Sequence, residues 1–150
     1  MMYLEDFHPG QTFDFTAAPV SKQDILDFAN RWDPQPLHLD EDHATKIHGG
    51  LIASGFQTLL LVFEPVMKEM MTGVANIGGM GFDNLRWLRP LHPDQPLAVQ
   101  IEVKSVRPSR SKLDRGILQY TLTAKNPAGE VAFTTDVPVM IKTRSGNNDA

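Results

Sequence analysis

The chain has 150 residues, 41% hydrophobic and 21% charged, which suits one ordinary domain with a substantial core and excludes a disordered chain. Its net charge of -4 argues against general nucleic-acid binding, which needs a basic face, and the absence of cysteine excludes disulfides and thiolate metal sites. No basic segment followed by an apolar one opens the chain, and its longest apolar stretch, 59–63, is too short to cross a bilayer. We therefore expect one domain over 1–150, with a polar tail at 144–150, in the cytoplasm and without nucleic-acid or membrane partners.

Two helices are predicted in the first half of the chain. Ser21 can cap a short amphipathic helix that has Asp24 in its first turn and ends before Asp33. A longer helix is expected to follow Gly49 and Gly50, and Pro65 should end or kink it. Apolar residues lie on most of its sides, which indicates a helix buried on most sides. Its apolar stripe consists of Ile52, Ala53, Phe56, Leu59, Leu60 and Phe63.

After Gly73 the apolar residues alternate with a period of two, which is typical of strands. The predicted strands cover residues 83–89, 97–104, 118–122 and 131–141. In the first of them, Leu85 and Trp87 should face inward and the arginines outward. The sequence Asn126-Pro127-Ala128-Gly129 predicts a hairpin turn, and Pro138 favours an edge position or a bulge for the last strand.

The order of these elements predicts the fold class. A short strand, a short helix, a long buried helix and then four strands describe an α+β fold, in which an antiparallel sheet wraps around one central helix. A sheet that a single helix covers on one face leaves its other face or its edge for a partner. We therefore expect a homodimer or a larger homo-oligomer.

A carboxylate and an imidazole lie five residues apart in Asp33-Pro34-Gln35-Pro36-Leu37-His38. The two prolines fix the backbone on either side of Gln35, so this loop can hold Asp33 and His38 on one small site. Such a pair can bind and polarise one water molecule, because proton transfer needs groups within hydrogen-bond reach. The alternative is that Asp33 caps a bend and that His38 is an ordinary surface histidine.

The paired glycines Gly49 and Gly50 form a second candidate feature. At the start of an apolar helix they would expose backbone N–H groups at the positive end of the helix dipole, where a developing oxyanion is stabilised. The alternative is a tight turn without a chemical role. Ser54 and Thr58 follow on the same predicted helix, where they either pack or line a pocket.

Two clusters of charged residues each allow a functional and a structural interpretation. The residues His38, Asp40, Asp42, His43 and His48 are dense enough to suggest a metal site, but they lack a helical i, i+4 histidine pair, so we interpret them as solvated loop residues and expect no metal. Four cations, Arg107, Arg110, Lys112 and Arg115, lie between two predicted strands. They are either a clamp for the phosphates of coenzyme A or a solvated hairpin loop.

Together, Asp33-Pro34-Gln35-Pro36-Leu37-His38 and His48-Gly49-Gly50-Leu51-Ile52-Ala53-Ser54-Gly55 resemble the hydratase motif of MaoC-like dehydratases and (R)-specific enoyl-CoA hydratases. Segments 84–91 and 107–111 resemble later segments of that family. One departure is Gln35, where the motif commonly has Asn, and we expect its side chain to support the loop.

The resemblance implies a hot-dog fold and a lyase that hydrates a trans-2-enoyl thioester, or dehydrates a 3-hydroxyacyl thioester, carried by coenzyme A or an acyl carrier protein. Asp33 and His38 would activate the water and return a proton to the substrate, Gly50 would supply an oxyanion N–H, and no cofactor is implied. The expected substrate-binding residues are Gly49, Leu51, Ser54, Thr58, Gly81, Arg107 and Arg110.

Two other functions fit the same sequence. A thioesterase would use a carboxylate to hydrolyse the thioester, and a non-catalytic protein could bind acyl thioesters without turning them over. The Asp33 and His38 pair favours hydration over both. Release of free thiol would indicate the thioesterase, and binding without turnover would indicate the binding protein.

Overall fold

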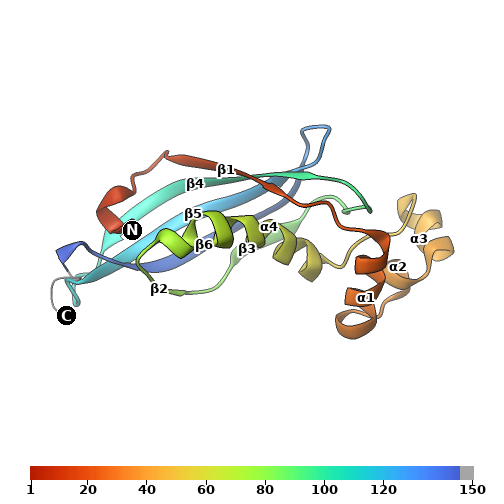
Figure 1. The fold of residues 1–150 in the computed structure, drawn as a ribbon, viewed down its shortest axis with the longest axis horizontal. Helices are drawn as coiled ribbons and strands as arrows, with labels where there is room; N and C mark the ends of the chain where they lie inside the picture. Colours follow the sequence, from red (N-terminus) through yellow and green to blue (C-terminus); the bar gives the residue numbers. More distant parts are fainter. Residues whose placement is uncertain (146–150) are drawn as a thin grey trace.

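The computed structural model describes residues 1–145 and contains one six-stranded antiparallel sheet (Figure 1). The strand order is β1-β4-β5-β6-β2, and β3 also pairs with β6. The strands are β1 (Thr12–Ala17), β2 (Asn76–Gly79), β3 (Asp83–Trp87), β4 (Leu97–Pro108), β5 (Arg115–Lys125) and β6 (Val131–Lys142). The predicted antiparallel sheet with a central helix is confirmed.

The helices divide into a central helix and a terminal group. In Figure 1 the helix α4 lies along the sheet, the helices α1 to α3 gather at one end, and the N-terminus and the end of β6 lie at the other. The helices are α1 (Lys22–Trp32), α2 (Pro36–Leu39), α3 (Glu41–His48) and α4 (Gly55–Glu69), with short 3-10 turns η1 (Leu4–Asp6) and η2 (Met71–Gly73). None of the helices in residues 1–145 is long and apolar enough to cross a membrane.

The predicted start of α1 is confirmed, because the Ser21 side chain accepts a hydrogen bond from the backbone N–H of Asp24 at 3.0 Å. The amphipathic helix buries Ile25 and Ala29. A hydrogen bond from the Gln57 amide to the carbonyl of Asp24, at 3.1 Å, ties α1 to α4. This contact fixes the helical end of the molecule against the central helix.

The predicted start of the central helix is wrong. Gly49 instead caps the C-terminus of α3 in the left-handed conformation, with φ of 75°, which glycine adopts without steric cost. Residues 51–54 then have no regular structure, and α4 begins at Gly55. The sequence pattern missed α2 and α3 because both are short and carry little apolar periodicity. Pro65 does not end α4, which continues to Glu69.

The expectation that α4 is buried on most sides is also wrong for the isolated chain. Its inner face buries Val62 and Val66 against the sheet, but Phe56 is 60% exposed and Leu60 is 55% exposed. The reason is that one sheet covers one side of a helix and the rest of its apolar surface has no neighbour. This exposed apolar face of α4 bears on how the protein assembles.

The predicted long strands are confirmed. Inward-facing Leu97, Val99, Ile101 and Val103 of β4 are all buried, and they alternate with more exposed residues. The turn between β5 and β6 closes with a hydrogen bond from the N–H of Gly129 to the carbonyl of Asn126, at 2.9 Å. The sequence missed β2, because a four-residue strand with two glycines has no detectable alternation.

The interpretation of Pro138 needs correction, because β6 is an interior strand between β5 and the β2–β3 side of the sheet. Pro138 pairs in register with Gln119 of β5 without a bulge there. On its other side it lies between the registers of β2 and β3, and its carbonyl accepts from the N–H of Met80 at 2.9 Å. The ladder is interrupted there, so a residue without an N–H is tolerated.

The outer end of β3 differs in part from expectation. Leu85 packs against the core and Arg86 and Arg89 are exposed, as predicted, but Trp87 is 45% exposed. The indole of Trp87 covers the start of α4 instead of entering the core. Of the predicted tail at 144–150, residues 146–150 lie outside the described part, and Arg144 pairs with Asp6 at 2.6 Å.

Candidate active site

The segment that follows α1 brings Asp33 and His38 together. Asp33 is the C-terminal cap of α1, and its N–H donates to the carbonyl of Ala29 at 2.9 Å. Pro36 occupies the start of α2, where a missing N–H costs nothing, and His38 lies on that short helix. The His38 Nε2 atom is 3.2 Å from Asp33 Oδ2, so the two side chains are in contact.

The Asp33 carboxylate is held by two neutral donors. The Ser54 hydroxyl donates to Oδ2 at 2.8 Å, and the Gln35 amide donates to Oδ1 at 2.6 Å. Burial by itself would raise the pKa of Asp33, but the hydrogen bonds from Gln35 and Ser54 and the adjacent His38 outweigh it and place the pKa below its ordinary value. Asp33 is therefore ionised at neutral pH. The expected support of the loop by Gln35 is present as this hydrogen bond.

The position of the proton on His38 follows from its other neighbour. His38 Nδ1 lies 2.9 Å from the carbonyl oxygen of Ile52, which can only accept, so Nδ1 carries a hydrogen. If the ring were neutral, the lone pair of Nε2 would face the Asp33 carboxylate. In the imidazolium form of the ring, the proton on Nε2 would lie between Nε2 and Oδ2, which are 3.2 Å apart. The pair can release that proton to one bound molecule and accept another from it.

Both side chains open into a cavity of about 460 Å³, a size typical of small-molecule sites. Phe56 and Thr58 of α4 line it, together with Trp87 and Leu88 at the end of β3. The indole N–H of Trp87 donates to the carbonyl of Gly55 at 2.8 Å, and its ring meets Phe56 edge-on with centroids 6.0 Å apart. The cavity thus joins one ionic pair to mostly apolar walls.

The N-terminus of α4 lies at this cavity, since Gly55 and Phe56 both line it. Ser54 is the N-cap residue but makes no side-chain cap, because its hydroxyl is directed to Asp33. The first N–H groups of a helix have no acceptor within the helix. The backbone N–H groups of Gly55 and Phe56 also have no other acceptor within residues 1–145.

Among the expected substrate-contacting positions, the neighbouring residues Gly49, Gly50 and Leu51 do not line this cavity. Gly49 caps α3, and Leu51 packs in the core while its carbonyl lies 3.0 Å from His92 Nδ1. A side chain at Gly50 would meet His92 at 3.5 Å. Because α4 begins five residues after Gly50, the helix-dipole argument for an oxyanion N–H at Gly50 is wrong, and its role by resemblance stays a prediction.

Gly81 lies at a separate apolar cavity of about 350 Å³, beneath the second half of α4. Phe63 and Met67 of α4, together with Tyr120 of β5, also line it. The Tyr120 hydroxyl is fully buried and has no hydrogen-bond partner among the described residues. Within one chain, Gly81 is therefore not a neighbour of the Asp33–His38 pair.

Arg107 and Arg110 lie at a third cavity, at the β4–β5 hairpin. The Asp33 cavity adjoins Trp87, which pairs through Phe133 with Ala124 of β5, whereas the hairpin cavity adjoins Ile117 of the same strand. Ala124 and Ile117 are seven positions apart along β5, which is about 23 Å at the usual rise per residue. Ile117 also alternates with the buried Leu118 and so faces away from α4. One chain does not bring these arginines to the Asp33–His38 pair.

The dense His and Asp cluster does not form a metal site in residues 1–145, where no three His, Cys, Asp or Glu side chains lie close enough to hold an ion. The interpretation as loop residues is wrong in detail. Asp40 caps α3 by accepting from the N–H of His43 at 3.1 Å, and His48 is the last residue of α3 and lines the Asp33 cavity.

Comparison with known proteins gives the same family that the motifs indicate. The family model of the MaoC like domain matches residues 6–126. A protein described as uncharacterized YdeM, from Bacillus subtilis (strain 168), is 37% identical over 142 residues, covering 94% of this chain and 99% of that protein.

Solved structures agree. A MaoC-like dehydratase from Rhodospirillum rubrum is 32% identical with a TM-score of 0.84, covering 96% of this chain and 99% of that one. The R-hydratase PhaJ1 from Pseudomonas aeruginosa shares the fold at 22% identity, with a TM-score of 0.67 over 95% of this chain and 86% of that one. These similarities show that the fold is the hot-dog fold. The chain belongs to the MaoC-like dehydratase family.

Two features of the site had no clear signal in the sequence. Ser54 was expected to pack or to touch substrate, but it holds the Asp33 carboxylate from 21 positions away. The carbonyl of Ile52, which fixes the His38 ring, belongs to backbone that carries no side-chain pattern at all. Both contacts depend on the extended segment 51–54 passing behind the Asp33–His38 pair.

Proposed function

We propose that the protein is a hydro-lyase that interconverts a trans-2-enoyl thioester and a 3-hydroxyacyl thioester, with coenzyme A as the thiol carrier. The observation that supports it best is the buried, hydrogen-bonded Asp33–His38 pair at the edge of a mostly apolar cavity. An anionic carboxylate supplies a base and an adjacent imidazolium supplies an acid, which are the two groups that addition of water across a double bond requires.

In the hydration direction, Asp33 accepts a proton from water while the water oxygen bonds to the β-carbon of the enoyl group. The electrons of the double bond move toward the thioester carbonyl, which becomes an enolate. His38 Nε2–H then delivers its proton to the α-carbon, so the product gains one hydrogen and one hydroxyl. The proton that Asp33 took from water passes to Nε2, 3.2 Å from Oδ2, and restores the pair. The dehydration reverses these steps through the same two groups.

The enolate oxygen needs donors, and we propose the free N–H groups at the start of α4. Gly55 and Phe56 line the same cavity as Asp33 and His38, and the positive end of the helix dipole favours developing negative charge. Ser54 contributes by using its hydroxyl on Asp33 and leaving these N–H groups uncapped. Thr58, one turn further on and buried at the cavity wall, is positioned to contact the acyl group.

We further propose that the functional unit is a homodimer in which a second copy covers the outer face of α4. The exposed apolar residues Phe56 and Leu60 continue onto the β2–β3 side of the sheet, because Phe56 meets Trp87 and Phe63 meets Phe82 edge-on. Met80, Phe82, Trp87 and Leu88 are also exposed there. Contiguous apolar surface of this kind usually marks an interface.

Sedimentation at micromolar concentration tests the dimer. The wild type should sediment as a dimer, and Leu60→Glu should shift it to a monomer because a charge would be buried in the interface. Ser105→Glu, at an exposed position of β4 away from α4, is the matched control and should remain dimeric. A wild type that stays monomeric would remove this part of the proposal.

The reaction is tested with a short trans-2-enoyl-CoA. We expect loss of the enoyl-thioester absorbance without release of free thiol, and formation of the 3-hydroxyacyl-CoA confirmed by mass spectrometry. Thiol release at the same rate would show a thioesterase instead. Saturable binding without any product would show a binding protein, and either result would overturn the proposed lyase.

A further inference from the structure

The hairpin between β4 and β5 has a charge opposite to that of the rest of the molecule. Residues 107–115 contain four of the 14 basic residues of the chain and only one of its 18 acidic residues. The chain as a whole carries -4, so this segment is a local reversal of sign. An acidic protein that binds an anion needs such a local concentration of positive charge.

Most of these cations are not neutralised within the chain. Arg115 forms a two-point ion pair with Asp114, with N···O distances of 2.8 and 2.9 Å. Arg107, Arg110 and Lys112 have no ion-pair partner among residues 1–145, whereas five cations elsewhere in this part of the chain each pair with a carboxylate. The exposed Lys142 lies opposite Arg115 in the register of β5 and β6 and adds a further positive charge.

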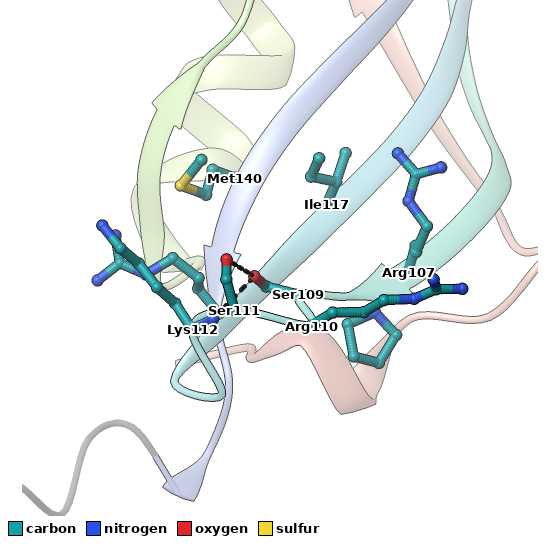
Figure 2. Close-up of a pocket in the computed structure, with 9 residues that line it drawn as sticks. Arg107, Ser109, Arg110, Ser111, Lys112, Ile117 and Met140 are labelled. Carbon is teal, nitrogen blue, oxygen red and sulfur yellow. Dashed lines mark hydrogen bonds between the residues drawn. The ribbon is translucent and has the colours of Figure 1, made fainter.

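The four cations of residues 107–115 line a cavity of about 630 Å³ on the face of the sheet away from α4. Figure 2 shows Arg107 and Arg110 on one side of it and Lys112 on the other, with the hydroxyls of Ser109 and Ser111 between them. The apolar side chains of Ile117 and Met140 form its floor. The volume lies within the range of small-ligand sites, and the lining combines cations, hydroxyl donors and an apolar surface.

The hairpin is also held in one shape. The N–H of Ser109 donates to the carbonyl of Arg115 at 3.0 Å, and the Ser109 hydroxyl accepts from the N–H of Lys112 at 3.1 Å. The N–H of Thr143 donates to the carbonyl of Asp114 at 2.9 Å and ties the tip to the end of β6. A preformed loop loses little conformational entropy when a ligand binds, which favours affinity.

We propose that this hairpin cavity binds a small molecule that carries two or more phosphate groups and an aromatic ring whose flat face packs on apolar side chains, such as a nucleoside polyphosphate or the nucleotide end of coenzyme A. The guanidinium groups of Arg107 and Arg110 match phosphate oxygens in a two-point geometry, and Lys112 contributes a point charge. The ring covers Ile117 and Met140. The cavity lies on the opposite face from Asp33 and His38, so this inference stands or falls separately from the proposed lyase activity.

Isothermal titration calorimetry with pyrophosphate, ATP and coenzyme A tests the site. We expect saturable binding of all three, with ATP and coenzyme A binding more tightly than pyrophosphate because only they bring a ring to the apolar floor. Tighter binding of coenzyme A than of ATP identifies the thioester carrier as the source of the phosphates. Equal binding identifies a free nucleotide. No saturable binding of ATP or of coenzyme A at millimolar concentration would overturn the proposal.

Variants locate the binding. The double variant Arg107→Ala/Arg110→Ala should weaken ATP binding by about tenfold or more, since it removes two charge-assisted contacts. Met140→Ser should weaken ATP and leave pyrophosphate unchanged. Lys125→Ala, at an exposed lysine at the other end of β5, is the matched control and should bind as the wild type does.

The fold of each variant is checked by its thermal midpoint, which should be unchanged because the substituted arginines are exposed. His38→Ala should retain full ATP binding, because it alters the cavity on the other face of the sheet. An Arg107→Ala/Arg110→Ala protein that binds ATP as tightly as the wild type would overturn the assignment. A Lys125→Ala protein that loses as much affinity would do the same, since the binding would then be general attraction to positive charge.

Discussion

The two ends of the sheet handle charge in opposite ways. At the helical end, Asp33 and His38 are mostly buried, at 15% and 6% side-chain exposure, and every polar atom of the pair has a partner within the chain. At the hairpin end, Arg107, Arg110 and Lys112 are exposed and lack ion-pair partners among the described residues. The first arrangement holds a carboxylate and an imidazole in a fixed geometry that suits proton transfer. The second leaves charge available for a ligand from outside.

The burial of charged side chains is related to their function in this molecule. A buried ion pair must be fully hydrogen-bonded to be tolerated, and that requirement also fixes the geometry that proton transfer needs. Exposed cations carry no such requirement, so their unpaired state costs the fold little. Substitutions at the helical end should therefore change catalysis steeply, whereas substitutions at the hairpin should change binding alone.

The strongest test of the comparison is the Asp33–His38 pair itself. Asp33→Asn and His38→Ala should each lower kcat by roughly two to four orders of magnitude, the usual contribution of a positioned acid or base. The double variant should cost little more than the worse single variant, because the two groups act as one unit. Steady-state kinetics on a short enoyl-CoA measures both. Additive losses, or a single variant with near wild-type rates, would rule out a shared proton.

A smaller effect is expected at Ser54, which holds Asp33 without touching the reacting atoms. Ser54→Ala removes one donor to the ionised carboxylate, so the pKa of Asp33 rises toward its ordinary value. The acid limb of the kcat/KM profile, which reports ionisation of this base, should therefore move to higher pH. Near neutral pH the carboxylate stays ionised, so a loss of rate there reflects its less fixed position rather than its pKa, and we expect it to be at most about tenfold, less than removal of the base itself. An acid limb that does not move would show that Ser54 only packs.

Substitution of Gly50 tests whether the oxyanion donor is the N–H of Gly50 or the N–H groups of Gly55 and Phe56. The structure places the free N–H groups of Gly55 and Phe56 at the cavity, and a methyl group at Gly50 would meet only His92, at 3.5 Å. Gly50→Ala should therefore lower activity by less than the roughly hundredfold that loss of one oxyanion donor costs. A folded Gly50→Ala or Gly50→Val protein with severely reduced kcat and an unchanged thermal midpoint would assign the donor to Gly50, as the family resemblance predicts.

The smallest expected effect concerns Tyr120, which fits neither end of the comparison because its hydroxyl is buried and has no partner among residues 1–145. Burial raises the pKa of Tyr120, so the hydroxyl stays neutral and simply lacks a hydrogen bond. An unsatisfied buried hydroxyl costs about 1–3 kcal/mol, and each kcal/mol shifts the midpoint of a chain of this size by roughly 2–4 °C, so Tyr120→Phe should raise the thermal midpoint by roughly 2–12 °C. Differential scanning calorimetry measures this shift. A lower midpoint would show that the hydroxyl has a partner in the assembled protein.

The sequence predicted those elements in which apolar residues recur regularly over a long stretch. The alternation in 97–104 and 131–141 predicted the two strands that carry much of the core, and Ser21 with Asp24 predicted the start of α1. The order of these elements sufficed for the α+β class, because a strand-rich chain with one long apolar helix has few ways to bury it. The Asp33 and His38 pair was also predictable, since two prolines restrict the four residues between them.

The tertiary structure alone decided the beginning of α4, the partners of the Asp33–His38 pair and the placement of the other candidate residues. A glycine pair followed by apolar residues fits a helix start and a helix C-cap equally well, and only the packing of α3 selected the second. Ser54 and the Ile52 carbonyl reach the pair through a segment without periodicity, so no local rule could assign them. Gly81 and Arg107 lie at cavities of their own because the strands carry them away from Asp33, and distance along a strand becomes distance in space only once the register is set.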